Sequence, residues 1–150
     1  MVSVSNSDQI RQELEKFKKP DNVANWILLG YKDANTLELK KTGSGVPSLV
    51  ASLADNECSY ILIRVVYNEN DEGFKDGIIG NKGNIKDVFI AWTGPSVGII
   101  EKGKKRSHVG DAKAILQPHH AELSAISKNN FNEKTIKERS APLSGSHVLD

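Results

Sequence analysis

The sequence Val88-Phe89-Ile90-Ala91-Trp92-Thr93-Gly94-Pro95-Ser96-Val97 passes from an apolar strand through a turn into the start of a helix. We expect the strand to run from Lys86 to Thr93, because β-branched and aromatic residues dominate it. Ser96 follows the Gly-Pro turn and can cap a helix that we expect from about Val97 to Gln117, before Pro118. The stretch therefore predicts a buried strand followed directly by a long helix.

Apolar residues outside this stretch repeat with strand or helix periods. The further predicted elements are a helix over about 7–19, strands over 24–31 and 36–40, a helix from Pro47, a strand over 59–67, a strand over 119–127 and a short helix after Asn132. Strands thus come in pairs separated by helices. This order favours an α+β fold, a mixed sheet covered by helices, over a doubly wound parallel sheet.

The long predicted helix carries two glycines, Gly103 and Gly110. Each costs about 1 kcal/mol relative to alanine in a helix interior, so we expect the helix to bend or fray there. The apolar residues that we expect to face inward are Ile99, Ala112, Ile115 and Leu116.

Length and composition indicate one soluble globular domain. The chain has 150 residues, 20 Lys and Arg against 19 Asp and Glu, and a hydrophobic fraction of 38%. This balance excludes a disordered polyelectrolyte and a histone-like nucleic-acid wrapper. We expect a domain over 1–140 with a flexible tail over 141–150, and a surface insertion or mobile flap over 68–85, which holds four glycines.

The cysteine content and the polar N-terminus indicate the cytoplasm. Cys58 is the only cysteine, so neither an internal disulfide nor a multi-cysteine zinc site can form. Met1–Gln9 is polar, and apolar runs such as Tyr60–Val66 are far shorter than the roughly 20 residues that span a bilayer. We expect neither a signal peptide nor a transmembrane segment.

An enzymatic site has few candidate residues. His119 and His120 are adjacent on a predicted strand, so their side chains point to opposite faces and cannot both bind one metal. The glycines over 77–83 lack the Gly-Lys-Ser/Thr ending of a phosphate loop. We expect no enzyme, cofactor or metal site; the alternative needs two of His108, His119 and His120 to converge in one pocket.

The charge distribution departs from a well-mixed surface in two places, and Lys82 with Lys86 at the base of the predicted insertion is a third candidate cluster. Between Glu101 and Lys113 five basic side chains stand against two acidic ones, and between Lys128 and Arg139 four stand against two. The patches include Lys102, Lys104, Lys105, Arg106, Lys134, Lys137 and Arg139. They are either solvated helix faces or contacts for an acidic protein surface or anionic lipid headgroups. Aromatic residues do not interleave with them, so we expect no nucleic-acid partner.

The quoted run from Val88 to Val97 resembles the actin-depolymerising-factor homology (ADF/cofilin-like) family, and most closely its coactosin branch. Further resemblance lies in Asn25-Trp26 with Gly30-Tyr31-Lys32, in the strand Ser59–Val65, and in His119–Leu123. The resemblance covers Ser7 to Arg139. It implies a mixed sheet of five or six strands sandwiched between helices.

The resemblance also implies a function and a set of contact residues. Lys86 matches a lysine with which coactosins bind filaments. The basic run Lys102–Arg106 matches the basic part of the long helix, and Lys134, Lys137 and Arg139 fall where the family has a filament-only surface. Ile99 or Ile100 would fill an apolar cleft of actin.

Departures from the family pattern suggest which form of actin is bound. The long helix has no methionine and carries glycines, unlike the helix with which cofilins bind monomers. We therefore expect a monomeric, cytoplasmic protein of the actin cytoskeleton that binds filaments without strong severing or monomer sequestration. The alternatives are an ADF/cofilin-type depolymerising factor that also binds monomers, or a module that binds anionic phosphoinositides.

Overall fold

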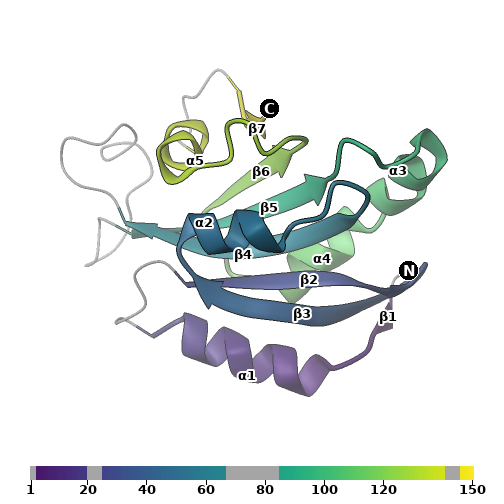
Figure 1. Ribbon diagram of the computed structural model, residues 1–150. Coiled ribbons are helices and arrows are strands. Elements are labelled where there is room, and N and C mark those ends of the chain that lie inside the picture. The colour runs from purple at the N-terminus through teal and green to yellow at the C-terminus, as the bar shows by residue number, and fades with distance from the viewer. Residues whose placement is uncertain (1–2, 20–24, 67–84, 141–145) are drawn as a thin grey trace.

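The computed structural model describes residues 3–19, 25–66, 85–140 and 146–150, which form a mixed sheet between two layers of helices (Figure 1). The elements in chain order are β1 (Ser3–Val4), α1 (Ser7–Phe17), β2 (Asn25–Asp33), β3 (Thr36–Ser44), α2 (Val46–Ser52), β4 (Cys58–Val66), β5 (Ile85–Thr93), α3 (Ile99–Arg106), α4 (Val109–Ile115), β6 (Ala121–Ala125), α5 (Glu133–Arg139) and β7 (Val148–Leu149). The predicted insertion over 68–85 lies outside the described residues except for Ile85, which begins β5.

The seven strands lie in the order β1-β3-β2-β4-β5-β6-β7. The four central strands pair antiparallel, whereas β1 with β3, β5 with β6, and β6 with β7 pair parallel. The prediction of a mixed sheet is confirmed. The two strands beyond the predicted set, β1 and β7, have two residues each, too few to give a sequence period.

Helices cover both faces of the sheet with separate apolar cores. On one face, Leu49 of α2 and Ile136 of α5 pack on side chains of the central strands such as Ile61. On the other face, Leu14 of α1 and Ala112 of α4 pack on side chains of the central strands such as Leu62. The helix predicted after Asn132 is confirmed, and the Asn132 side chain accepts a hydrogen bond from the Thr135 amide at 2.9 Å.

The turn after β5 fits closely against the loop that precedes β4. The Trp92 indole donates a hydrogen bond to the Ala54 carbonyl at 2.9 Å, and the Gly94 and Ser96 amides donate to the carbonyls of Glu57 and Asp55. A Cβ atom at Gly94 would overlap the Asp55 carbonyl oxygen. The Trp-Thr-Gly sequence therefore fixes where the following helix leaves the sheet.

Two predictions about the helices and the tail are wrong. The long helix is divided into α3 and α4 at Ser107 and His108, not at its glycines, because His108 turns into the protein interior there. Residues 146–150 are not a flexible tail: Val148 and Leu149 pair with β6, and Leu149 is fully buried. Residues 141–145 lie outside the described part of the chain.

Candidate interaction surface

Helix α3 is the least packed helix of the described chain, because none of its residues is buried. The side chains of Ile99 and Ile100 are 88% and 77% exposed. The prediction that Ile99 faces inward is wrong, since α3 projects beyond the end of the sheet (Figure 1). Two adjacent, exposed isoleucines on one short helix are an unusual apolar feature for a protein surface.

A groove separates α3 from the turn between β2 and β3. Apolar surface from Ile99, Ile100, Ala34 and the Tyr31 ring lines it, and Lys104 and Glu101 also contribute. The groove therefore offers an apolar surface with charged neighbours, the composition expected of a protein interface.

Lys105 holds α3 against the Tyr31 ring of β2, which lines the same groove. Its ammonium lies 2.8 Å from a Glu101 carboxylate oxygen and 4.2 Å from the centre of the Tyr31 ring, and its side chain is 14% exposed. The attraction of a cation to an aromatic face adds to the ion pair. Lys105 is therefore less available to a partner than Lys104 and Arg106, which are exposed.

A chain of hydrogen bonds beneath α3 sets the position of its C-terminal end. The Tyr60 hydroxyl donates to the Lys105 carbonyl at 3.0 Å, the Tyr31 and Tyr60 hydroxyls are 2.8 Å apart, and His108 Nδ1 lies 2.8 Å from the Tyr31 hydroxyl. A carbonyl can only accept, so Tyr60 accepts from Tyr31, and Tyr31 accepts from the Nδ1–H of His108. Burial raises the pKa of Tyr60 to about 12 and that of Tyr31 further still.

Comparison with known proteins identifies the family of the chain. Residues 3–141 match the model of the cofilin/tropomyosin-type actin-binding proteins. The chain belongs to this family.

Relatives and solved structures agree with that assignment. Coactosin of Dictyostelium discoideum is 26% identical over 97% of this chain and 93% of its own length. Drebrin-like protein B of Xenopus laevis is 30% identical over 81% of this chain, which spans only 30% of that longer protein. Crystal structures of human coactosin-like protein show the same fold, with a TM-score of 0.74 at 14% identity over 91% of this chain and 95% of that one. The predicted resemblance to the ADF homology family, close to coactosin, is thereby confirmed.

Lys86, which the family resemblance matches to a filament-binding lysine, is buried near the start of β5. Lys86 is 1% exposed, and its ammonium donates to the Ser140 carbonyl at the C-terminal end of α5 at 3.4 Å. A positive charge is favoured at that end of a helix. The prediction that Lys86 contacts filaments stays a prediction, and in this structure the Lys86 side chain is buried beneath the surface that a partner would meet.

The next residue of β5 is also buried and charged. Asp87 receives two hydrogen bonds from the Arg64 guanidinium, at 2.7 and 3.1 Å. Removing one member of such a pair leaves a buried charge. We therefore assign this pair to the stability of the domain.

The second predicted basic patch lies on α5, on the opposite side of the sheet from α4. Lys134 is exposed, whereas the Lys137 side chain is 13% exposed and lies 3.4 Å from the Glu133 carboxylate. Arg139 is half-buried. The structure thus places the two basic patches on different elements, and the exposed cations of the second patch are Lys128 and Lys134.

The three candidate histidines have separate partners. His108 belongs to the tyrosine chain, His119 lies 3.1 Å from the Glu122 carboxylate, and His120 Nδ1 accepts from the Asp87 amide at 2.8 Å. The hydrogen bond from His119 lowers the pKa of Glu122, with a smaller contribution from Lys113. The described residues contain no cluster of metal-binding side chains and no helix that could cross a membrane.

Sequence reasoning did not find the roles of Tyr31 and Tyr60 beneath α3. The two residues are 29 positions apart, and His108 is another 48 positions beyond Tyr60. The apolar residues beside them in β2 and β4 predict that both tyrosines are buried, but they predict no specific contact. Nothing in their local sequence indicates that their hydroxyl groups meet.

Proposed function

We propose that this chain binds the side of actin filaments, and that the exposed surface of α3 makes the main contact. Family membership supports actin as the partner. The observation that supports α3 as the contact is the pair of exposed isoleucines beside the groove, at 88% and 77% exposure. The packing of the core does not require these exposed side chains, whereas covering them with the apolar cleft of a partner is favourable.

Cations around the isoleucines would direct the encounter. Lys102, Lys104 and Arg106 lie on the same helix, and none of them makes an ion pair with the described residues. Complementary charge raises the association rate and is screened as salt is added. We therefore propose that acidic side chains of actin meet these three cations while the isoleucines enter an apolar cleft.

The preference for filaments over monomers is the finer part of the proposal. A helix as short as α3, with no buried residue, owes little stability to packing. Ordering it against a partner therefore subtracts from the affinity. A filament offers a second subunit, which α5 could reach with Lys134 from the other side of the sheet. This favours filament binding in the cytoplasm with weak monomer sequestration and weak severing.

Co-sedimentation with actin filaments, run beside a titration of labelled actin monomers, tests the proposal. Wild-type protein should pellet with filaments and bind monomers at least about tenfold more weakly, a difference of about 1.4 kcal/mol. Lys104→Glu reverses one exposed charge on α3, and Lys41→Glu does the same on β3, away from α3. Filament binding should fall for the first variant alone. Equal losses in the two variants, or equal affinity for monomers, would overturn the assignment.

The unpaired cations also support one alternative function. Lys102, Lys104 and Arg106 would attract a membrane that contains phosphoinositides. Flotation with phosphatidylcholine vesicles, with and without phosphatidylinositol bisphosphate, separates this function from actin binding. Strong flotation without filament pelleting would make the membrane the main partner.

A further inference from the structure

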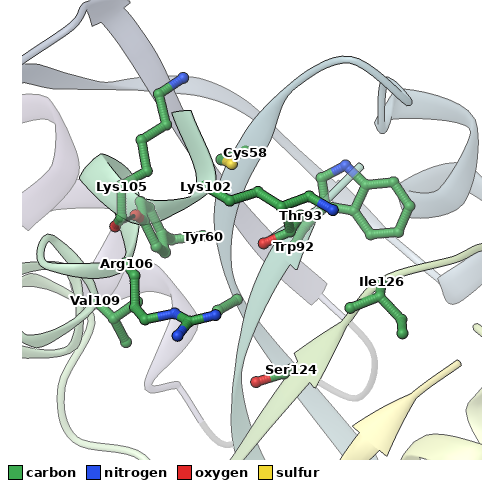
Figure 2. A pocket seen from close by; sticks show the side chains of 11 residues that line it. Cys58, Tyr60, Trp92, Thr93, Lys102, Lys105, Arg106, Val109, Ser124 and Ile126 are labelled. Atoms are coloured by element: carbon green, nitrogen blue, oxygen red, sulfur yellow. Dashed lines mark hydrogen bonds between the residues drawn. The ribbon is translucent and has the colours of Figure 1, made fainter. Parts of the chain in front are cut away.

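A second pocket lies behind α3, between that helix and the ends of strands β4, β5 and β6 (Figure 2). Its volume is about 300 Å³, at the lower end of the range for small-molecule sites. It is distinct from the groove that holds Ile99 and Ile100, because the two share only Lys105 among their lining residues.

The charge in this pocket is positive and uncompensated. Lys102, Lys105 and Arg106 line it, and no carboxylate does. Glu101 neutralises Lys105, but the side chains of Lys102 and Arg106 make no ion pair or hydrogen bond with the described residues. Figure 2 shows both side chains extending from α3 over the pocket, while Lys105 points away from it. Two positive charges thus face a partly enclosed space.

The remaining walls supply hydroxyl groups and apolar surface. Thr93 ends β5 and Ser124 lies near the end of β6, and these strands are parallel neighbours. Crevices at the carboxyl ends of parallel strands are common ligand sites in open sheets. Val109 and Ile126 add apolar surface at the rim. The pocket therefore suits a small anion that carries an apolar group.

We propose that this pocket binds a phosphate monoester, with Lys102 and Arg106 as the phosphate ligands. A monoester carries a charge of about −1.5 to −2 near neutral pH and has three acceptor oxygens. Its charge matches the two cations, whereas a carboxylate would leave one of them uncompensated. The guanidinium of Arg106 can donate two parallel hydrogen bonds to phosphate oxygens, and the hydroxyls of Thr93 and Ser124 can donate to a third. This inference does not depend on actin binding.

Isothermal titration calorimetry with phenyl phosphate and with inorganic phosphate, at constant ionic strength, tests the assignment. Phenyl phosphate should bind saturably with one site per chain and more tightly than benzoate, its carboxylate counterpart. Lys102→Gln and Arg106→Gln should each weaken binding about tenfold or more, because each removes a charge-assisted hydrogen bond. Lys104→Gln removes the same charge from the same helix but lies outside the pocket, and it should change the affinity less than about twofold. Thermal melts verify that all three variants are folded.

Several results would overturn the proposal. These are the absence of saturable binding at millimolar phenyl phosphate, equal binding of benzoate, and equal weakening by all three substitutions, which would indicate general electrostatic attraction. Inositol trisphosphate and vesicles with phosphatidylinositol bisphosphate then distinguish a soluble ester from a lipid headgroup as the source of the phosphate. Binding to vesicles without binding to any soluble ester would replace the pocket with a membrane-facing surface.

Discussion

Truncation of Ile99 and Ile100 to alanine should weaken filament binding without affecting the fold. Each substitution removes three carbon atoms, and burial contributes about 0.8 kcal/mol for each buried CH₂ group. In the free protein the two side chains are 88% and 77% exposed, so almost all of this contribution is still available to a partner. Full burial of the three carbon atoms by a partner would contribute about 2 kcal/mol per residue to the binding free energy. Burial of somewhat more than half of their surface would contribute about 1.4 kcal/mol.

The expected effect on affinity follows from these values. Each single variant should bind filaments about tenfold more weakly, and the double variant about a hundredfold more weakly. The free energy of unfolding should change by less than about 0.5 kcal/mol, because the removed atoms touch solvent already. Co-sedimentation over a range of filament concentrations gives the affinity, and urea denaturation gives the stability.

Ile126 provides the matched control. It is also an exposed isoleucine, at 49%, but it follows β6 and lies away from the groove. Ile126→Ala should leave filament binding within about twofold of wild type, the ordinary scale of a surface substitution. If the Ile99 and Ile100 variants also stay within twofold while remaining folded, the apolar contact does not exist and the reasoning from exposure is refuted.

Three further predictions concern the stability of α3 and the residues beneath it. Gly103→Ala should stabilise the protein by about 1 kcal/mol and strengthen filament binding slightly, because the added Cβ would meet no atom within 4 Å apart from its chain neighbours and the backbone of its own helix; a loss of stability in urea would contradict this. Tyr31→Phe should lower the free energy of unfolding by about 1–3 kcal/mol, because the Nδ1–H of His108 loses its acceptor; an unchanged urea midpoint would show that this bond contributes nothing. Stability should fall as the pH rises from about 10 towards 12, because unfolded tyrosine titrates near 10 whereas the pKa of Tyr60 in the folded protein is raised to about 12. Parallel urea titrations of wild type and Tyr60→Phe should show a smaller fall in the variant, and identical profiles would exclude Tyr60 as a source.

Much of the fold could be predicted because its signals are local. The cap at Asn132, the glycine-proline turn after Trp92 and the apolar runs of β4 and β5 each lie within a few residues, and each was placed correctly. The edge strands β1 and β7 were not predicted, because a strand of two residues is too short to show an alternation of polar and apolar side chains. The break at Ser107 and His108 was also missed, because local sequence does not reveal that His108 is buried and hydrogen-bonded to Tyr31, 77 positions away.

The candidate site could be predicted only in part. The charge and hydropathy of a residue do not reveal whether distant segments of the chain bury its side chain. The sequence by itself determined that α3 carries cations and isoleucines, and that the strand before it ends in a tight turn. Only the tertiary structure decided that Ile99 is exposed while Lys86 is buried, and that Lys105 has an ion-pair partner within the described part of the chain whereas Lys102 and Arg106 have none there. Those outcomes depend on which distant segments pack against each residue, because burial and pairing are properties of contacts and not of residue types.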